Sequence, residues 1–239
     1  MALPYNDLEK GKKEQVATMF NNIAHRYDFL NHFLSLGIDK LWRKKSIKLL
    51  KNRASDSILD IATGTGDFAL ASLKLSPKEV VGIDISTGML EIGNEKIRKK
   101  GLEEIIRLLE GDAENLPFED KSFDAITVGF GVRNFENLEK GLKEMNRVLK
   151  EDGTAIILEF SKPEKFPVKQ IYKFYFKYIL PGLGRFFSKD NSAYTYLPES
   201  VEEFPYGQRL IKILEGCGYK NCRAINLSFG IASIYYCEK

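Results

Sequence analysis

Residues 59–67 read LDIATGTGD, an apolar run that enters a glycine-rich turn and then opens a helix. Gly64 and Gly66 carry no Cβ, so the backbone can turn tightly there and approach a ligand closely. A second apolar run ends at Asp84, where a carboxylate is placed to accept both hydroxyls of a ribose. This arrangement indicates a nucleoside site beside the turn.

Further short apolar runs, each followed by a polar or helical segment, surround this turn. Buried parallel strands have this sequence form. The expected parallel strands are residues 57–62, 79–84, 105–110, 123–129 and 154–160, with helices expected at 68–75, 89–100 and 138–149. Two closing runs, 223–227 and 232–237, predict an antiparallel hairpin. The fold class is therefore α/β, a Rossmann-like seven-stranded sheet, mostly parallel with a C-terminal antiparallel hairpin.

The length of 239 residues fits a single domain. Within it we expect a helical N-terminal cap at 1–54, a cofactor-binding core at 55–161, an aromatic and basic helical insert at 162–200, and a terminal helix and hairpin at 201–239. Lys and Arg number 36 against 33 Asp and Glu, a net charge of +3. This charge is too small to indicate nucleic acid as a partner.

Cysteine and histidine are scarce. Cys217, Cys222 and Cys237 lack C-x-x-C spacing and fit neither a disulfide framework nor a zinc site, so a reduced, cytoplasmic chain is expected. The only histidines, His25 and His32, are too few for a metal site, and no metal is expected. The N-terminus lacks the apolar core of a signal peptide, and no run approaches the ~18 residues of a membrane span. Any contact with a membrane is expected to be peripheral.

Two cofactors compete for the glycine-rich turn. The spacing Gly64-x-Gly66-x-x-Ala69 also satisfies the dinucleotide fingerprint, so NAD is an alternative. Carboxylates near the turn, however, suit the ammonium of S-adenosylmethionine better than a pyrophosphate. Asp60 precedes the turn, and Asp112 with Ala113 begins an acidic loop suited to adenine. From residue 55 onward the chain resembles the class I S-adenosylmethionine-dependent methyltransferases.

Three blocks carry a more specific resemblance. Residues 19–35, continuing to Asp39-x-x-Trp42-Arg43, residues 129–134 (GFGVRN) and residues 147–161 are similar to the demethylmenaquinone methyltransferases and their ubiquinone-pathway relatives. Leu30, Asp39 and the pair Glu151-Asp152 depart from the usual pattern, and none of them touches the turn. The resemblance implies C-methylation of a polyprenylated quinol, with S-adenosylmethionine as cofactor.

The expected site residues form two groups. Arg133 is the preferred catalytic residue, since a fixed guanidinium stabilises a developing phenolate. Tyr27 and Asp28 help to close the pocket, and Asp28 and His25 are candidate bases. The expected cofactor-binding residues are Asp60, Gly64, Thr65, Gly66, Asp84, Asp112 and Ala113.

The segment 166–196 holds ten aromatic residues and five Lys or Arg. Lys169, Lys173 and Lys177 share one side of a helical wheel, which favours an amphipathic helix for a membrane surface and a prenyl tail. A core-covering helix and the interface of a homodimer are the alternatives for this segment.

For the whole chain, three other functions compete. They are methylation of a benzoquinol or of another lipid or small molecule, the activity of an NAD-dependent dehydrogenase, and the role of a non-catalytic binding module.

Overall fold

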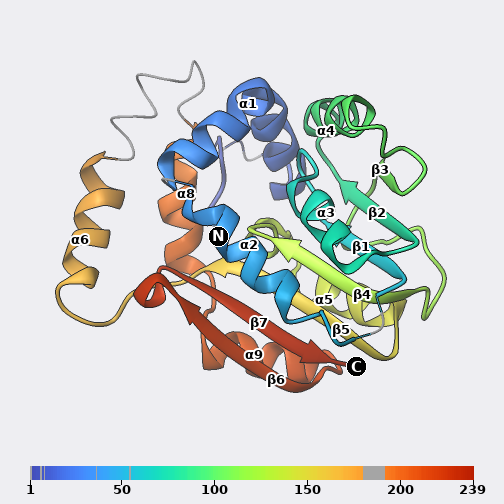
Figure 1. The fold of residues 1–239 in the computed structure, drawn as a ribbon. Helices are drawn as coiled ribbons and strands as arrows, with labels where there is room; N and C mark the ends of the chain where they lie inside the picture. The colour runs from blue at the N-terminus through green and yellow to red at the C-terminus, as the bar shows by residue number, and fades with distance from the viewer. Residues whose placement is uncertain (1, 6, 8, 36, 54, 180–191) are drawn as a thin grey trace.

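The computed structural model describes residues 2–5, 7, 9–35, 37–53, 55–179 and 192–239 (Figure 1). Its centre is a seven-stranded sheet in the order β3-β2-β1-β4-β5-β7-β6. The strands are β1 (Ser57–Ile61), β2 (Glu79–Asp84), β3 (Ile106–Glu110), β4 (Phe123–Gly129), β5 (Leu149–Phe160), β6 (Lys220–Leu227) and β7 (Ala232–Glu238). The first five pair in parallel, and β7 pairs antiparallel with both β5 and β6. The expected fold class is confirmed.

The last strand of the chain is not an edge strand, because β7 lies between β5 and the edge strand β6. Its residues are almost all buried, whereas β6 forms an edge. The antiparallel pairing places Cys222 and Cys237 side by side, with their Cα atoms 4.2 Å apart, and a disulfide joins them. The expectation that the cysteines form no disulfide is therefore wrong, because strand pairing brings together residues that lie 15 apart in the chain. Cys217 is free and buried.

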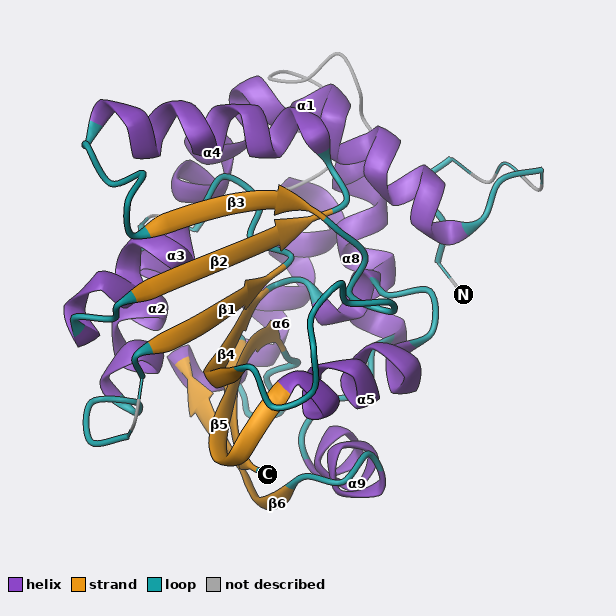
Figure 2. Ribbon diagram, turned by 90° about the vertical axis from the view of Figure 1, so that its right-hand side faces the viewer, coloured by secondary structure: helices purple, strands orange, loops and turns teal. Residues whose placement is uncertain are grey.

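Helices cover both faces of the sheet (Figure 2). They are α2 (Ile38–Lys48), α3 (Asp67–Ser72), α4 (Thr87–Lys99), α5 (Leu138–Val148) and α9 (Gln208–Gly216), with short helical turns at η1 (Leu73–Leu75), η2 (Val132–Asn134) and η4 (Ser228–Gly230). Trp42 and Ile47 of α2 pack with Phe68 of α3 in one core. Leu142 of α5 and Leu210 of α9 belong to the core of the other face. The sheet is thus the middle layer of three.

Four further helical segments lie outside these layers. They are α1 (Lys12–Leu34), α6 (Val168–Phe174), the π-helical turn η3 (Tyr175–Ile179) and α8 (Ser192–Glu203). Met19 of α1 and Tyr196 of α8 share a small core of their own. The helical start of the chain and a helical, aromatic insert agree with the expectation, although the part of the insert at 180–191 lies outside the described residues. Among the described helices, none is both long and apolar enough to cross a membrane.

Candidate functional site

The glycine-rich turn joins β1 to α3 in left-handed backbone. Gly64 has φ 58° and Gly66 has φ 80°, a conformation that side chains with a Cβ disfavour. No atom lies within 4 Å of the place where a Cβ on Gly64 would stand. Because Gly64 also lines a cavity, its backbone is open to a ligand.

Asp60 supports this turn from behind. Its carboxylate is fully buried and accepts hydrogen bonds from the Thr63 hydroxyl (2.6 Å), the Thr127 hydroxyl (2.7 Å) and the Ala69 backbone N–H (3.1 Å). Burial raises the pKa of Asp60 to about 6, although these hydrogen bonds oppose the rise. Asp60 does not line the cavity, so its contribution there is its charge and the shape of the turn.

Asp84 closes the opposite side of the turn. One of its carboxylate oxygens accepts the Gly64 N–H at 2.8 Å, and the other accepts the Ser86 N–H at 2.9 Å. Burial raises the pKa of Asp84, and both backbone bonds oppose that rise. Asp84 ends β2 where β1 enters its turn, and it lines the cavity. Asp84 therefore lies at the cavity, in a position that is compatible with the expected hydrogen bonds from the hydroxyls of a ribose.

The first cavity lies at the carboxyl ends of the parallel strands. Its lining includes Gly64, Asp84, Asp112 and Ala113, four of the seven residues expected to bind the cofactor. Thr65 and Gly66 belong to the turn and Asp60 belongs to β1, and none of the three lines the cavity. Acidic side chains predominate among its charged lining residues, which are Lys13, Asp84, Asp112, Glu114 and Glu136. An acidic wall suits a cationic sulfonium with an ammonium tail and opposes a pyrophosphate. The residues present therefore fit S-adenosylmethionine.

Lys13 of α1 is a lining residue that sequence reasoning missed. Its ammonium lies 2.6 Å from an Asp112 carboxylate oxygen, and this bond raises the pKa of Lys13. Asp112 is the side chain expected to accept the amino group of adenine. In this structure a cation of the chain itself, the Lys13 ammonium, binds that carboxylate.

A hydrogen bond and ion pairs connect helix α1 to the glycine-rich turn and to the helices beside it. Asp28 accepts the Thr65 hydroxyl at 2.5 Å and pairs with Lys96 at 2.5 Å, and Lys96 also pairs with Asp67 at 3.1 Å. Asp28 does not line the first cavity. Its geometry is that of a residue that positions α1 against the turn.

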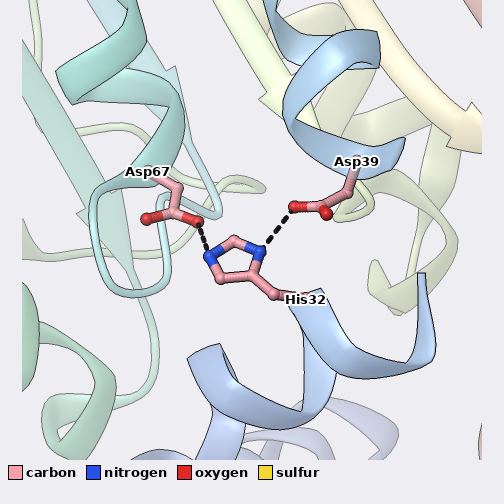
Figure 3. A group of neighbouring side chains, drawn as sticks. All are labelled: His32, Asp39 and Asp67. Carbon is pink, nitrogen blue, oxygen red and sulfur yellow. Dashed lines mark hydrogen bonds and ion pairs between the residues drawn. The ribbon is translucent and has the colours of Figure 1, made fainter. Parts of the chain in front are cut away.

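A second part of this network contains His32 (Figure 3). Its Nδ1 lies 2.8 Å from Asp39, and its Nε2 lies 3.6 Å from Asp67. The three side chains have the composition of a metal site. Arg43, however, donates to both carboxylates, which supplies a cation from the chain itself. We therefore interpret the cluster as an ion network that joins α1, α2 and α3.

A second cavity of about 400 Å³ lies next to the first. Most of its wall is apolar or aromatic, from α1, α2, α6, η3 and α8. The residues that line it are Met19, Phe20, Ile23, Tyr27, Asn31, Ser35, Ile38, Trp42, Phe130, Arg133, Phe160, Val168, Ile171, Tyr172, Tyr175, Phe176, Ala193, Tyr194, Tyr196, Leu197, Ser228 and Ile231. Phe20, Tyr27 and Phe130 line both cavities. These three side chains separate the two spaces.

Arg133 supplies the charged group of the second cavity. It follows β4 on η2, and its side chain is only 8% exposed. Its guanidinium donates to the Phe130 carbonyl and to Glu159, which is fully buried, at 2.9 Å. Burial raises the pKa of Glu159, while the charge of Arg133 lowers it. The pair fixes a guanidinium at the wall of an apolar chamber, where such a group acts strongly on a developing negative charge.

Tyr27 lies at the wall common to both cavities. Desolvation raises the pKa of its hydroxyl to about 12, against the opposing charges of Arg133 and Arg43. At neutral pH this hydroxyl is therefore a hydrogen-bond donor. His25, on the same helix, is exposed and lines neither cavity. Of the residues expected to be catalytic, the structure brings Arg133 and Tyr27 to one chamber and leaves Asp28 outside it.

The ubiE/COQ5 methyltransferase family model matches residues 8–239. The demethylmenaquinone methyltransferase of Bacteroides fragilis is 49% identical over 99% of this chain and 96% of that protein. The ubiquinone/menaquinone biosynthesis C-methyltransferase UbiE of Geotalea uraniireducens is 46% identical over 97% of this chain and 98% of its own length.

Solved structures share the fold at lower identity. An S-adenosylmethionine-dependent methyltransferase of Thermotoga maritima, a possible histamine N-methyltransferase, has a TM-score of 0.65 at 20% identity and covers 93% of this chain and 98% of its own. One from Aquifex aeolicus has a TM-score of 0.59 at 21% identity, with 82% and 88% covered. The match to the family model over residues 8–239, with the relatives that are 49% and 46% identical, shows that the chain belongs to the ubiE/COQ5 methyltransferase family.

Proposed function

We propose that the chain transfers the methyl group of S-adenosylmethionine to a ring carbon of a polyprenylated quinol, with demethylmenaquinol as the substrate and menaquinol as the product. The observation that carries this proposal is the shared wall of the two cavities. An acidic chamber suited to the cofactor adjoins a larger apolar chamber that contains a fixed guanidinium. The relatives named for the same conversion support it.

The residues of the chain have separable roles in this proposal. Bound S-adenosylmethionine supplies an electrophilic methyl group. Gly64, Asp84, Asp112 and Ala113 would hold it, and Asp60 and Thr65 would keep the turn in shape from outside the cavity. Binding both reactants side by side supplies much of the rate enhancement, because it replaces a chance encounter by a fixed one.

Arg133 would stabilise the negative charge that develops on the quinol during the reaction. As the quinol hydroxyl releases its proton to solvent, electron density would move onto the adjacent ring carbon, which forms a bond to the methyl group while the methyl–sulfur bond breaks and S-adenosylhomocysteine leaves. The methylated carbon then loses its hydrogen as a proton, and the ring regains its aromatic quinol form. The guanidinium stabilises the negative charge on the ring oxygen, and Glu159 keeps the guanidinium in place. Tyr27 donates at the common wall, and the apolar lining excludes water from the reacting atoms.

Peripheral contact with an anionic bilayer completes the proposal. Three elements each contribute both a lining residue of the second cavity and an exposed apolar neighbour: Ile38 and Leu41 on α2, Ile171 and Phe174 on α6, and Ser228 and Phe229 on η4. Leu41 is 64% exposed and Phe229 is 84% exposed. Lys169 and Lys173 are exposed on α6, where they would meet acidic headgroups. A prenyl tail would thus pass from the bilayer into the cavity.

The test of the reaction uses methyl-deuterated S-adenosylmethionine with reduced demethylmenaquinone and a reduced demethylated benzoquinone in lipid vesicles. Mass spectrometry of the quinones should show the label on the naphthoquinone. Label on the benzoquinone alone would contradict demethylmenaquinol as the substrate and would indicate a role in ubiquinone synthesis instead. Absence of label from both rings, with bound cofactor demonstrated, would refute the quinol substrate.

The test of the membrane contact is flotation with vesicles that contain phosphatidylglycerol. The double variant Leu41→Asp with Phe229→Asp should lose binding, whereas Leu109→Asp, an exposed leucine on β3, should bind like the wild type. Equal flotation of both variants would contradict the proposed surface. Sedimentation of the same proteins without lipid distinguishes bilayer contact from a homodimer through this face.

A further inference from the structure

The loop that carries Arg133 comprises residues 130–137 and connects β4 to α5. Lys12, the first residue of α1, donates from its ammonium to two carbonyls of this β4–α5 loop, those of Arg133 at 2.8 Å and Phe135 at 2.9 Å. Lys12 is only 8% exposed, so water competes little for its ammonium. The start of α1 therefore holds the backbone to which the Arg133 side chain is attached.

The same junction contains a hydrogen bond in the opposite direction. The Glu136 carboxylate of the loop accepts the Lys12 backbone N–H at 2.8 Å. This N–H is one of the donors left unpaired at the start of a helix, where a carboxylate is favourable. Gly11 permits the approach, because a Cβ there would lie 2.8 Å from the same Glu136 oxygen. Helix and loop thus bind each other through one side chain from each.

A cation at the position of Lys12 has an electrostatic cost. Burial and the charge of Arg133 lower the pKa of Lys12 to about 8, while Glu203, Glu114 and Glu136 oppose the shift. At neutral pH Lys12 therefore stays protonated within the electrostatic reach of a second buried cation. An apolar side chain would avoid this cost but would leave two carbonyls without their donor. The position thus requires a donor that reaches both carbonyls.

Arg133 is held by two contacts of different kinds. Glu159 binds its guanidinium at 2.9 Å, whereas Lys12 binds its backbone carbonyl. The backbone contact matters because η2 is a 3-10 turn of only three residues, and such turns have poorer hydrogen-bond geometry than an α-helix. Among the described residues, those that line the two chambers do not include Lys12. Its effect on a bound quinol must therefore pass through Arg133.

We propose that Lys12 is a positioning residue for methyl transfer, which holds Arg133 at the wall of the second cavity without touching either reactant. This inference rests on the proposed function and adds to it a residue from outside both chambers. Stabilisation of a developing charge depends on where the guanidinium lies, and a displacement of about 1 Å is enough to lower a rate substantially. Loss of the Lys12 ammonium permits such a displacement.

Lys12→Met tests the proposal, because it keeps an unbranched side chain and removes the ammonium. Its kcat for demethylmenaquinol should fall about 10-fold, less than the loss from Arg133→Lys, since the guanidinium is displaced rather than removed. In an Arg133→Met background the same substitution should change kcat by less than about 2-fold, because no guanidinium remains to be positioned. Lys10→Met is the matched control and should keep the wild-type kcat, since Lys10 is exposed and pairs with Glu14 at 3.5 Å.

Hydrogen exchange gives a second readout that needs no quinol. The Nε–H of Arg133 is buried, so nuclear magnetic resonance of protein with isotope-labelled arginine should show that it exchanges slowly with solvent. Arg133→Lys identifies the signal by removing it. Exchange should be about 10-fold faster in Lys12→Met and unchanged in Lys10→Met. Lys12→Gln gives the same comparisons if circular dichroism shows that Lys12→Met does not fold.

A wild-type kcat in Lys12→Met would overturn the proposal. So would equal factors of loss in the two Arg133 backgrounds, because a residue that supports only the fold reduces activity in both. Unchanged exchange of the Arg133 Nε–H would overturn it independently of any substrate. Faster exchange in Lys12→Met, when the wild type binds S-adenosylmethionine but methylates no quinol, would refute the proposed function and leave Lys12 as the residue that holds Arg133.

Discussion

Replacing Asp60 by Asn should stabilise the fold at neutral and basic pH. Asp60 is fully buried behind the glycine-rich turn, and its pKa of about 6 lies above its ordinary value of 3.8. Asn keeps the geometry: its amide oxygen can accept from Thr63 and Ala69, and its amide nitrogen can face the Thr127 hydroxyl. The change therefore removes a buried charge without removing a hydrogen-bonding position.

The size of the effect follows from the two pKa values of Asp60. A pKa raised by folding means that the native state prefers the protonated acid, so the stability contributed by this group is complete below about pH 4 and is lost as the pH rises through about 6. The difference between 6 and 3.8, at about 1.4 kcal/mol per pKa unit, corresponds to about 3 kcal/mol above pH 7. Asp60→Asn should recover most of this free energy.

Urea denaturation followed by circular dichroism at pH 5 and pH 8 measures the effect. The free energy of unfolding of Asp60→Asn should exceed that of the wild type at pH 8 and should converge with it toward low pH. Asp124→Asn is a control of opposite sign, because hydrogen bonds from Lys150 and Ser57 outweigh desolvation and lower the pKa of Asp124. A loss of stability in Asp60→Asn at pH 8, or a pH dependence equal to that of the wild type, would refute the reasoning.

Cofactor affinity gives a second readout for Asp60→Asn. If the carboxylate is retained for its charge beside the ammonium of the cofactor, S-adenosylhomocysteine should bind the variant more weakly even though its fold is more stable. Stability is often lower at functional sites for this reason. Unchanged affinity in calorimetry would limit Asp60 to a structural role.

Three other substitutions test the remaining site. Asp84→Ala should weaken the binding of S-adenosylhomocysteine by about 10- to 100-fold in calorimetry, because charged hydrogen bonds to the ribose are lost. Glu110→Ala, at the end of the adjacent strand, is the control and should bind like the wild type. Equal affinity of the two variants would contradict the assignment of Asp84 to the ribose. Arg133→Lys retains a cation yet should reduce turnover about 100-fold with cofactor affinity unchanged, and wild-type turnover would remove Arg133 from the mechanism. Lys13→Ala frees Asp112, so cofactor affinity should rise up to about 5-fold; a fall would show that Lys13 helps to bind the cofactor.

The five parallel strands were predictable from sequence because strands buried on both faces form continuous apolar runs. The position of β7 between β5 and β6 was not, since a hairpin pattern does not say which of its strands joins the sheet. The disulfide between Cys222 and Cys237 joins the two strands of the predicted hairpin, and it was missed because the hairpin was predicted without the register that makes the two cysteines neighbours.

The cofactor chamber was predictable in part. The carboxyl ends of parallel strands meet at one edge, so Gly64, Asp84 and Asp112 had to come together. Asp28 differs because consecutive helical residues point about 100° apart, so Tyr27 faces the cavities while Asp28 faces Lys96. Tyr172 lines the second cavity from α6, and no local sequence pattern reports how that helix packs.

Helix α1 contributes walls to both cavities, through Val16 and Phe20 in one and Met19 and Ile23 in the other. A change in its position therefore alters the affinity of both chambers at once. By thermodynamic linkage, any factor by which the cofactor changes quinol affinity must equal the factor by which the quinol changes cofactor affinity. Because one helix forms walls of both chambers, the two reactants are expected to bind with coupled affinities, and the sign of that coupling is the same whichever reactant binds first.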